Sequence, residues 1–164
     1  MADKAFNIER GIKRELVTQI DKIGFLGLGL NKKNNKSNDY REEGAGAQRI
    51  DLFIFAVALG VRDGKRTKLK TSESFIKFSA LVDRQDEKAF LYSVALEVLR
   101  KENKENKIVD DDAVKEIVEE YANTGFYAIK EMIGDAEAWS EDKQKIMIYS
   151  LMSKNIEMYE KIVG

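Results

Sequence analysis

Carboxylates are the strongest candidates for chemistry in this sequence, because the 164-residue chain contains no histidine and no cysteine. It therefore has no imidazole base, no thiolate nucleophile and no metal site built on either side chain. Three consecutive aspartates, Asp110, Asp111 and Asp112, offer the oxygen ligands that Mg²⁺ or Mn²⁺ prefers. Acids in a first helical turn also cap free N–H groups and complement the helix dipole. We expect these aspartates to cap a helix, with metal binding as the weaker alternative, and we predict no cofactor.

The neighbouring glutamates do not single out a catalytic pair. Carboxylate catalysis needs two acids held in a cleft with separated pKa values. The helical spacing of Glu116, Glu119 and Glu120 predicts that they lie on a solvated face. We therefore expect a protein without enzymatic activity, and a carboxylate–metal hydrolase or nuclease is the remotest alternative.

A second group of residues is basic and falls within nine positions. Its members are Arg62, Lys65, Arg66, Lys68 and Lys70. Contacts to phosphate dominate nucleic-acid affinity, so this cluster is a candidate for binding DNA or an acidic protein partner. No aromatic residue interleaves it and no helix-turn-helix spacing follows it. A solvated loop, or a counterpart to acidic residues of the same fold, is the alternative interpretation.

Charge is unevenly distributed along the chain, although 28 bases and 29 acids give a net charge of only -1. Residues 1–108 carry 22 bases and 16 acids, residues 109–142 carry 2 bases and 11 acids, and residues 143–164 carry 4 bases and 2 acids. The three segments thus have charges of +6, -9 and +2. This asymmetry indicates either complementary surfaces within the fold or a separate partner for each pole.

Helices must position these residues, because apolar side chains recur at helical spacing through most of the chain. We predict an all-α fold: an irregular bundle of about five helices, with one short two-stranded hairpin as an option. The segment over residues 50–61 is apolar almost all round, which is typical of a central helix. It ends at Asp63 and Gly64, a pair suited to a tight turn. In the helix that begins near Asp110, we expect Gly125 to cause an interruption, through a kink or a close helix crossing.

The sequence predicts a single helical domain over residues 1–164. It divides into an N-terminal helix and Gly-rich segment (1–30), an exposed loop (31–46) and a main bundle (47–164). Asn7 is the expected cap of the first helix. Residues 67–69 and 76–78 could pair as short strands or remain coil.

The last predicted helix carries an apolar stripe that is wider than surface packing needs. Its candidate oligomer surface includes Met147, Leu151, Met152, Met158 and Tyr159. Met-rich surfaces adapt readily to partners, so a homodimeric interaction module without a nucleic-acid role is an alternative function. No secretory signal is visible, and the longest apolar run is too short to span a bilayer, so we expect a cytoplasmic protein without membrane contact.

Two segments resemble a known family. Residues 51–67, DLFIFAVALGVRDGKRT, are similar to a D-L-x-x-F-A-x-A-L-G-x-x-x-G-x-R block, and residues 119–132, EEYANTGFYAIKEM, are similar to an E-x-Y-A-N-x-G motif. This order of blocks resembles small accessory proteins encoded beside DNA phosphorothioation (sulfur modification) and restriction systems. The matching positions are Phe55, Ala56, Leu59, Gly60, Gly64 and Arg66, followed by Glu120, Tyr121, Ala122, Asn123 and Gly125.

The resemblance implies a place in antiviral defence by DNA modification and restriction, without an established catalytic activity or cofactor. It implies protein partners from such a system and leaves contact with duplex DNA open. Most of the matching residues are apolar or small and suit packing. Arg66 and Asn123 are the polar positions that packing explains least.

Overall fold

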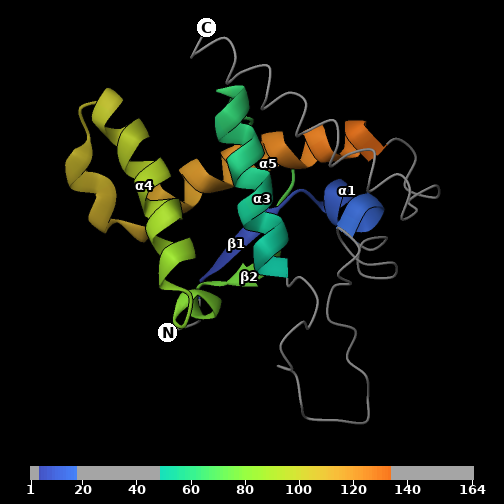
Figure 1. The fold of residues 1–164 in the computed structure, drawn as a ribbon, viewed down its shortest axis with the longest axis horizontal. Coiled ribbons are helices and arrows are strands. Elements are labelled where there is room, and N and C mark those ends of the chain that lie inside the picture. Colours follow the sequence, from blue (N-terminus) through green and yellow to red (C-terminus); the bar gives the residue numbers. More distant parts are fainter. Residues whose placement is uncertain (1–3, 18–48, 134–164) are drawn as a thin grey trace, which may run out of the picture.

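Three long helices frame the computed structural model, which describes residues 4–17 and 49–133 (Figure 1). They are α3 (Arg49–Asp63), α4 (Gln85–Lys101) and α5 (Asp111–Ile133). Shorter helical pieces are α1 (Arg10–Ile12), which continues as a π-helical turn (Lys13–Val17), and two 3₁₀ turns (Phe78–Leu81 and Glu105–Val109). The prediction of a predominantly all-α fold is confirmed. The Gly-rich segment, the loop over residues 31–46 and the last predicted helix lie outside the described residues.

The two strands, β1 (Ala5–Ile8) and β2 (Glu73–Lys77), pair antiparallel with Phe6 opposite Ile76. This two-stranded sheet corrects one expectation, the helix cap at Asn7, and decides between the two alternatives left open for residues 67–69. Asn7 does not cap a helix, because it lies within β1, and the helix begins only at Arg10. Residues 67–69 are not the partner strand, because they have irregular backbone and β2 pairs with the N-terminal strand instead.

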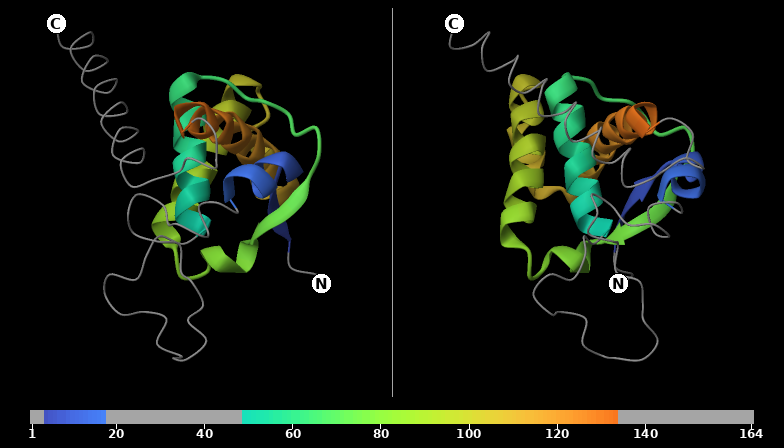
Figure 2. Two further views of the ribbon diagram at one scale, coloured as in Figure 1. Left: turned by 90° about the vertical axis from the view of Figure 1, so that its right-hand side faces the viewer. Right: turned by 45° about the vertical axis from the view of Figure 1, so that its right-hand side comes forward.

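Helices α3 and α5 cross with their backbones in contact (Figures 1 and 2). A Cβ atom on Gly60 would overlap the backbone of Tyr121, and one on Gly125 would overlap the backbone of Ala56. The close crossing expected at Gly125 is therefore present. The expected interruption is wrong, since α5 is continuous from Asp111 to Ile133.

A single hydrophobic cluster joins the N-terminal segment to the three long helices. Aromatic rings form part of it: Phe6 stacks on Phe78, and Phe75 meets Phe126 edge to face, with ring centroids 4.3 and 6.0 Å apart. Helix α3 is less enclosed than its sequence predicts. Leu52 and other inward residues are buried, but Val61 is 40% exposed near the C-terminal end of the helix.

Candidate nucleic-acid interface

The segment of residues 65–70, called the basic segment below, runs from the end of α3 toward β2 (Figure 2). Gly64 turns the chain into it with a φ of 64°, a conformation that glycine adopts without steric cost. The Gly64 N–H donates to the carbonyl of Val61 at 3.0 Å, and the Lys65 N–H donates to the carbonyl of Gly60 at 3.3 Å. This pair of bonds is a Schellman motif, which satisfies the last carbonyls of α3 and fixes the direction in which the chain leaves.

Hydrogen bonds to its backbone hold the basic segment against α5. The Thr67 N–H donates to the carbonyl of Glu120 at 3.1 Å. The carbonyls of Thr67 and Lys68 accept from Asn123 Nδ2 at 3.2 and 3.4 Å. These bonds take the place of a strand ladder, which explains why residues 67–69 are not part of the sheet.

Arg66 points inward from the segment and is neutralised by carboxylates. Its Nε and Nη2 atoms lie 2.8 and 2.7 Å from Glu120 Oε2, and its Nη1 lies 3.3 Å from Glu102 Oε1. The Glu120 side chain is only 8% exposed, and a pair of this kind loses far more when one partner is removed than a surface pair does. Arg66 is therefore an anchor of the segment rather than a free cation.

Glu9 is a second anchor, and it lies far away in the sequence. Its Oε1 accepts from the Lys70 N–H at 2.9 Å and from Asn123 Nδ2 at 3.2 Å, and its Oε2 accepts from the Tyr127 hydroxyl. Burial raises the pKa of Glu9, but the hydrogen bonds from Lys70, Tyr127 and Asn123 outweigh burial and leave this pKa below its ordinary value. The hydrogen bond to Glu9, together with burial, raises the pKa of Tyr127 to about 12.

Asn123 connects these anchors. It is 2% exposed, and its amide group donates both to the carboxylate of Glu9 and to the basic segment. Its Oδ1 is buried without a hydrogen-bond partner in the part of the chain that the structure describes. Arg66 and Asn123, the two motif positions that packing explains least, thus have the same role: they hold one irregular segment on α5.

Three lysines of the predicted basic cluster remain available to a ligand. Lys65, Lys68 and Lys70 are exposed, and none of their side chains forms a hydrogen bond or an ion pair among residues 4–17 and 49–133, although the charge of Lys70 helps to lower the pKa of Glu9. Arg62 differs from them, because it pairs with Asp63 at 3.0 Å and its Nη1 is buried without a hydrogen bond within those ranges. The structure therefore separates the five predicted bases into three outward lysines and two engaged arginines.

The three consecutive aspartates have separate partners. Asp110 accepts from the Asp112 N–H at 3.0 Å and so caps α5, Asp111 accepts from the Tyr92 hydroxyl at 2.9 Å, and Asp112 pairs with Lys4 at 2.9 Å. No group of three or more acidic, histidine or cysteine side chains suited to a metal ion occurs within the described ranges.

The predicted solvated face of glutamates is partly wrong. Glu119 and Glu120 are 8% and 6% exposed, because β1 and the basic segment pack over this side of α5. Glu119 accepts from the Asn7 N–H at 2.5 Å and pairs with Lys115 at 2.8 Å. Burial, outweighing these contacts, raises the pKa of Glu119.

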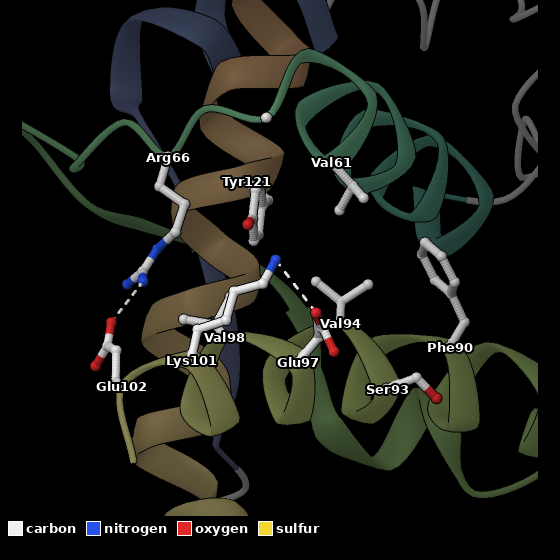
Figure 3. A pocket seen from close by; sticks show the side chains of 11 residues that line it. Val61, Arg66, Phe90, Ser93, Val94, Glu97, Val98, Lys101, Glu102 and Tyr121 are labelled. Carbon is white, nitrogen blue, oxygen red and sulfur yellow. Dashed lines mark hydrogen bonds and ion pairs between the residues drawn. The ribbon is translucent and has the colours of Figure 1, made fainter. Parts of the chain in front are cut away.

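A groove of about 620 Å³ lies beside the basic segment (Figure 3). It is bounded by the end of α3, by α4 and by Tyr121 of α5, and Arg66 lies on its border. Its apolar lining consists of Val61, Phe90, Val94, Val98 and Tyr121. Ion pairs between Glu97 and Lys101, at 3.2 Å, and between Arg66 and Glu102 mark its polar rim.

Sequence reasoning did not find Glu9. No local pattern marks this residue, since its partners Lys70 and Asn123 lie 61 and 114 positions away. The candidate oligomer surface at Met147, Leu151, Met152, Met158 and Tyr159 lies outside the described residues. None of the helices within the described ranges combines the length and apolar character that crossing a bilayer requires.

Comparison with known proteins supplies the biological setting. The family model described as DNA sulphur modification system-associated protein 4 matches residues 33–161. No curated protein and no solved structure matches the chain. The match includes both segments on which the resemblance was based, and it covers more than half of the chain.

Proposed function

The chain belongs to the family of DNA sulphur modification system-associated protein 4, and from this premise we propose that it is a non-enzymatic accessory protein of such a system. It acts through protein partners of the system and contacts duplex DNA through Lys65, Lys68 and Lys70.

One observation carries the DNA contact: the basic segment is fixed from the inside while its lysines face outward. Fixing the backbone of an irregular segment costs roughly 1–2 kcal/mol per residue in conformational entropy. A loop that only needs to be solvated has no use for buried anchors such as Glu9, Glu120 and Asn123. Three ordered lysines, none of which forms an ion pair within the described residues, make a surface that an anionic backbone can neutralise. Membership in a family tied to DNA modification favours DNA as that anion.

The non-enzymatic part of the proposal rests on the engaged acids. Asp110 caps a helix, Asp111 and Asp112 contact Tyr92 and Lys4, and Glu120 binds Arg66. Each of these four carboxylates therefore has a structural task, and the groove beside Arg66 presents mainly apolar surface.

The first test is duplex-DNA binding followed by fluorescence anisotropy over a range of salt concentrations. The variant Lys65→Glu/Lys68→Glu/Lys70→Glu is expected to bind at least about tenfold more weakly at low salt, because three phosphate contacts are lost. The slope of log affinity against log salt should also become shallower by about 2.7, at roughly 0.9 for each lost contact.

The matched control changes charge equally elsewhere. Lys77→Glu/Lys88→Glu/Lys107→Glu replaces three other exposed lysines and leaves the basic segment intact. It should retain most of the affinity. Equal losses in both variants would show that only net charge matters, and unchanged DNA binding in the first variant would remove the segment from the interface.

Sulphur-modified duplexes provide a second arm of the same test. A phosphorothioate diester keeps the single negative charge of a phosphate diester, and lysine ammonium groups recognise charge rather than a planar pattern of acceptors. We therefore expect modified and unmodified duplexes of one sequence to bind with affinities within about threefold of each other. A strong preference for either duplex would contradict recognition by lysines alone.

A further inference from the structure

The groove beside the basic segment has the features of a protein interface. Phe90, Val94 and Val98 lie one helical turn apart along α4 and are only partly buried, and Val61 and Tyr121 form the facing wall (Figure 3). Charged pairs border this apolar strip. An apolar centre with a polar rim is the usual anatomy of a specific protein–protein contact.

We infer that this groove is occupied by helix α4 of a second copy of the chain, packed antiparallel to the first about a two-fold axis at Val94. In such an interface each copy presents the same patch, and a residue on the axis meets its own counterpart. Val94 lies at the middle of the apolar strip, with Phe90 four residues before it and Val98 four residues after it. The strip is therefore complementary to itself when one copy is reversed.

Charge at the two ends of α4 supports the antiparallel arrangement. The first turn carries Asp86 and Glu87, and the last turn carries Arg100 and Lys101. These acids lie eight and seven residues before Val94, and these bases lie six and seven residues after it. Reversing one copy about Val94 places the acidic turn of each helix level with the basic turn of the other.

Two of these charged side chains form no ion pair within the described residues. Asp86 and Arg100 are exposed, and their side chains have no partner in residues 4–17 or 49–133. Pairing between copies gives both a counter-ion. A parallel arrangement would instead bring like charges together, which lowers affinity and selects against that geometry.

This inference goes beyond the proposed function and does not depend on it. The groove residues lie beside the basic segment but do not include Lys65, Lys68 or Lys70. Dimer formation and DNA contact can therefore be lost independently of each other.

The first experiment measures assembly of the full chain by sedimentation velocity over a range of concentrations. Val94→Glu places a charge on the axis, where it faces its own copy, and is expected to raise the dimer dissociation constant about 30-fold or more. The control is Val109→Glu, because Val109 is 86% exposed and lies outside the groove. It should leave the dissociation constant within about twofold of the original value.

The second experiment uses the absence of cysteine from the chain. With Val94→Cys, two copies can form a disulfide only if their α-carbons approach to roughly 4.4–6.8 Å. Mild oxidation of this variant should give covalent dimers at least tenfold faster than oxidation of Val82→Cys, whose parent residue is 65% exposed and outside the groove. The substitution is conservative in size, so this test does not depend on a charge buried in the groove.

Dimers that are weakened by Val94→Glu and cross-linked through Val94→Cys support the inference. A chain that sediments as a monomer at all concentrations overturns it, as does a dimer that is insensitive to Val94→Glu. A monomer whose groove binds a helix of a different protein also overturns it. Equal cross-linking rates for Val94→Cys and Val82→Cys would place the two-fold axis elsewhere.

Discussion

At the scale of single residues, a few buried polar side chains fix the position of the basic segment and its lysines. Asn123 and Glu9 are buried, and both bond to the backbone of the basic segment. Arg66 adds an ion pair with a buried carboxylate. These residues act at a distance from any ligand, by fixing the segment that carries Lys65, Lys68 and Lys70.

Replacing Asn123 by alanine is expected to destabilise the fold by about 1–3 kcal/mol, because buried acceptors in Glu9 and the basic segment lose their donor. It should also weaken DNA binding severalfold, since the lysines must then be ordered on binding. Urea unfolding and the anisotropy titration measure the two effects. A variant that loses stability but binds DNA with full affinity would separate the anchors from the interface.

Glu9 should make stability depend on pH in the acidic range. Its pKa in the folded protein is below its ordinary value of 4.5, so its stabilising contribution is present above about pH 4.5 and is lost as the pH falls through the folded-state value. Glu9→Gln is expected to lower the free energy of unfolding by about 1–3 kcal/mol at pH 7, and the difference from the original protein should shrink below pH 4. Urea titrations at several pH values measure this difference.

Glu119 provides the contrast, because burial raises its pKa above 4.5. The folded state then binds a proton more tightly than the unfolded chain, so its contribution is present below pH 4.5 and declines as the pH rises through the folded-state pKa. Relative to the original protein, Glu119→Gln should therefore gain stability as the pH rises from 4 to 7. Parallel pH profiles for the two glutamine variants would contradict this account.

At this scale the sequence predicted the basic cluster but not its division into free and engaged members. The grouping of five bases in nine positions is a local property. Whether Arg66 is free depends on Glu120, which is 54 residues away and is brought close only by the fold. Glu9 was not predicted for the same reason, since its partners are distant in the sequence. The distant segments that cover Glu119 and Glu120 likewise explain why these two residues were expected on a solvated face.

At the scale of elements, the crossing of α3 and α5 positions the whole interface. Gly60 and Gly125 bring the helix backbones together, and the basic segment then leaves α3 directly over Glu120 and Asn123. A side chain at either glycine would push the two helices apart. The distance between the basic segment and its anchors on α5 therefore depends on both positions being glycine.

Gly125→Ala is expected to destabilise the protein by about 3 kcal/mol or to prevent folding, because the new methyl group overlaps the backbone of Ala56. Gly11→Ala is the matched control. Gly11 also lies in a helix, but a Cβ there would have no atom within 4 Å, so this change should be neutral or stabilise by up to about 1 kcal/mol. Thermal unfolding followed by circular dichroism compares them, and equal midpoints would contradict the crossing.

The long helices could be predicted because their apolar residues repeat every three or four positions over several turns. Strand β1 could not, since Phe6 and Ile8 alternate over only four residues and Ile8, Ile12 and Leu16 also fit a helix. Which pattern prevails there is decided by β2, which lies more than 60 residues further along the chain.

At the scale of the whole molecule, the uneven charge along the chain is partly neutralised by ion pairs inside the fold. Ion pairs within the described residues join the positive N-terminal block to the negative block that follows it, as Lys4 pairs with Asp112 and Arg66 with Glu120. Lys130 and Glu15 make the reverse connection. This is the arrangement expected if the two blocks complement each other within one fold. Lys65, Lys68 and Lys70 in the basic segment, and Asp86 and Arg100 near the ends of α4, are among the charged side chains that form no ion pair within the described residues.

The contacts of β1 and Glu9 with distant parts of the chain also determine the order in which parts of the protein can fold during synthesis. Asn7 bonds to Glu119 and Glu9 to Asn123, at separations of 112 and 114 residues. On a ribosome, the N-terminal strand emerges long before α5 exists, so the Asn7 N–H and the Glu9 carboxylate lack their α5 partners until most of the chain has been synthesised. Contacts between such distant residues slow folding and prolong the exposure of apolar surface to aggregation. The lysine surface is thus among the last features to form, because it requires the chain to be synthesised at least as far as Tyr127.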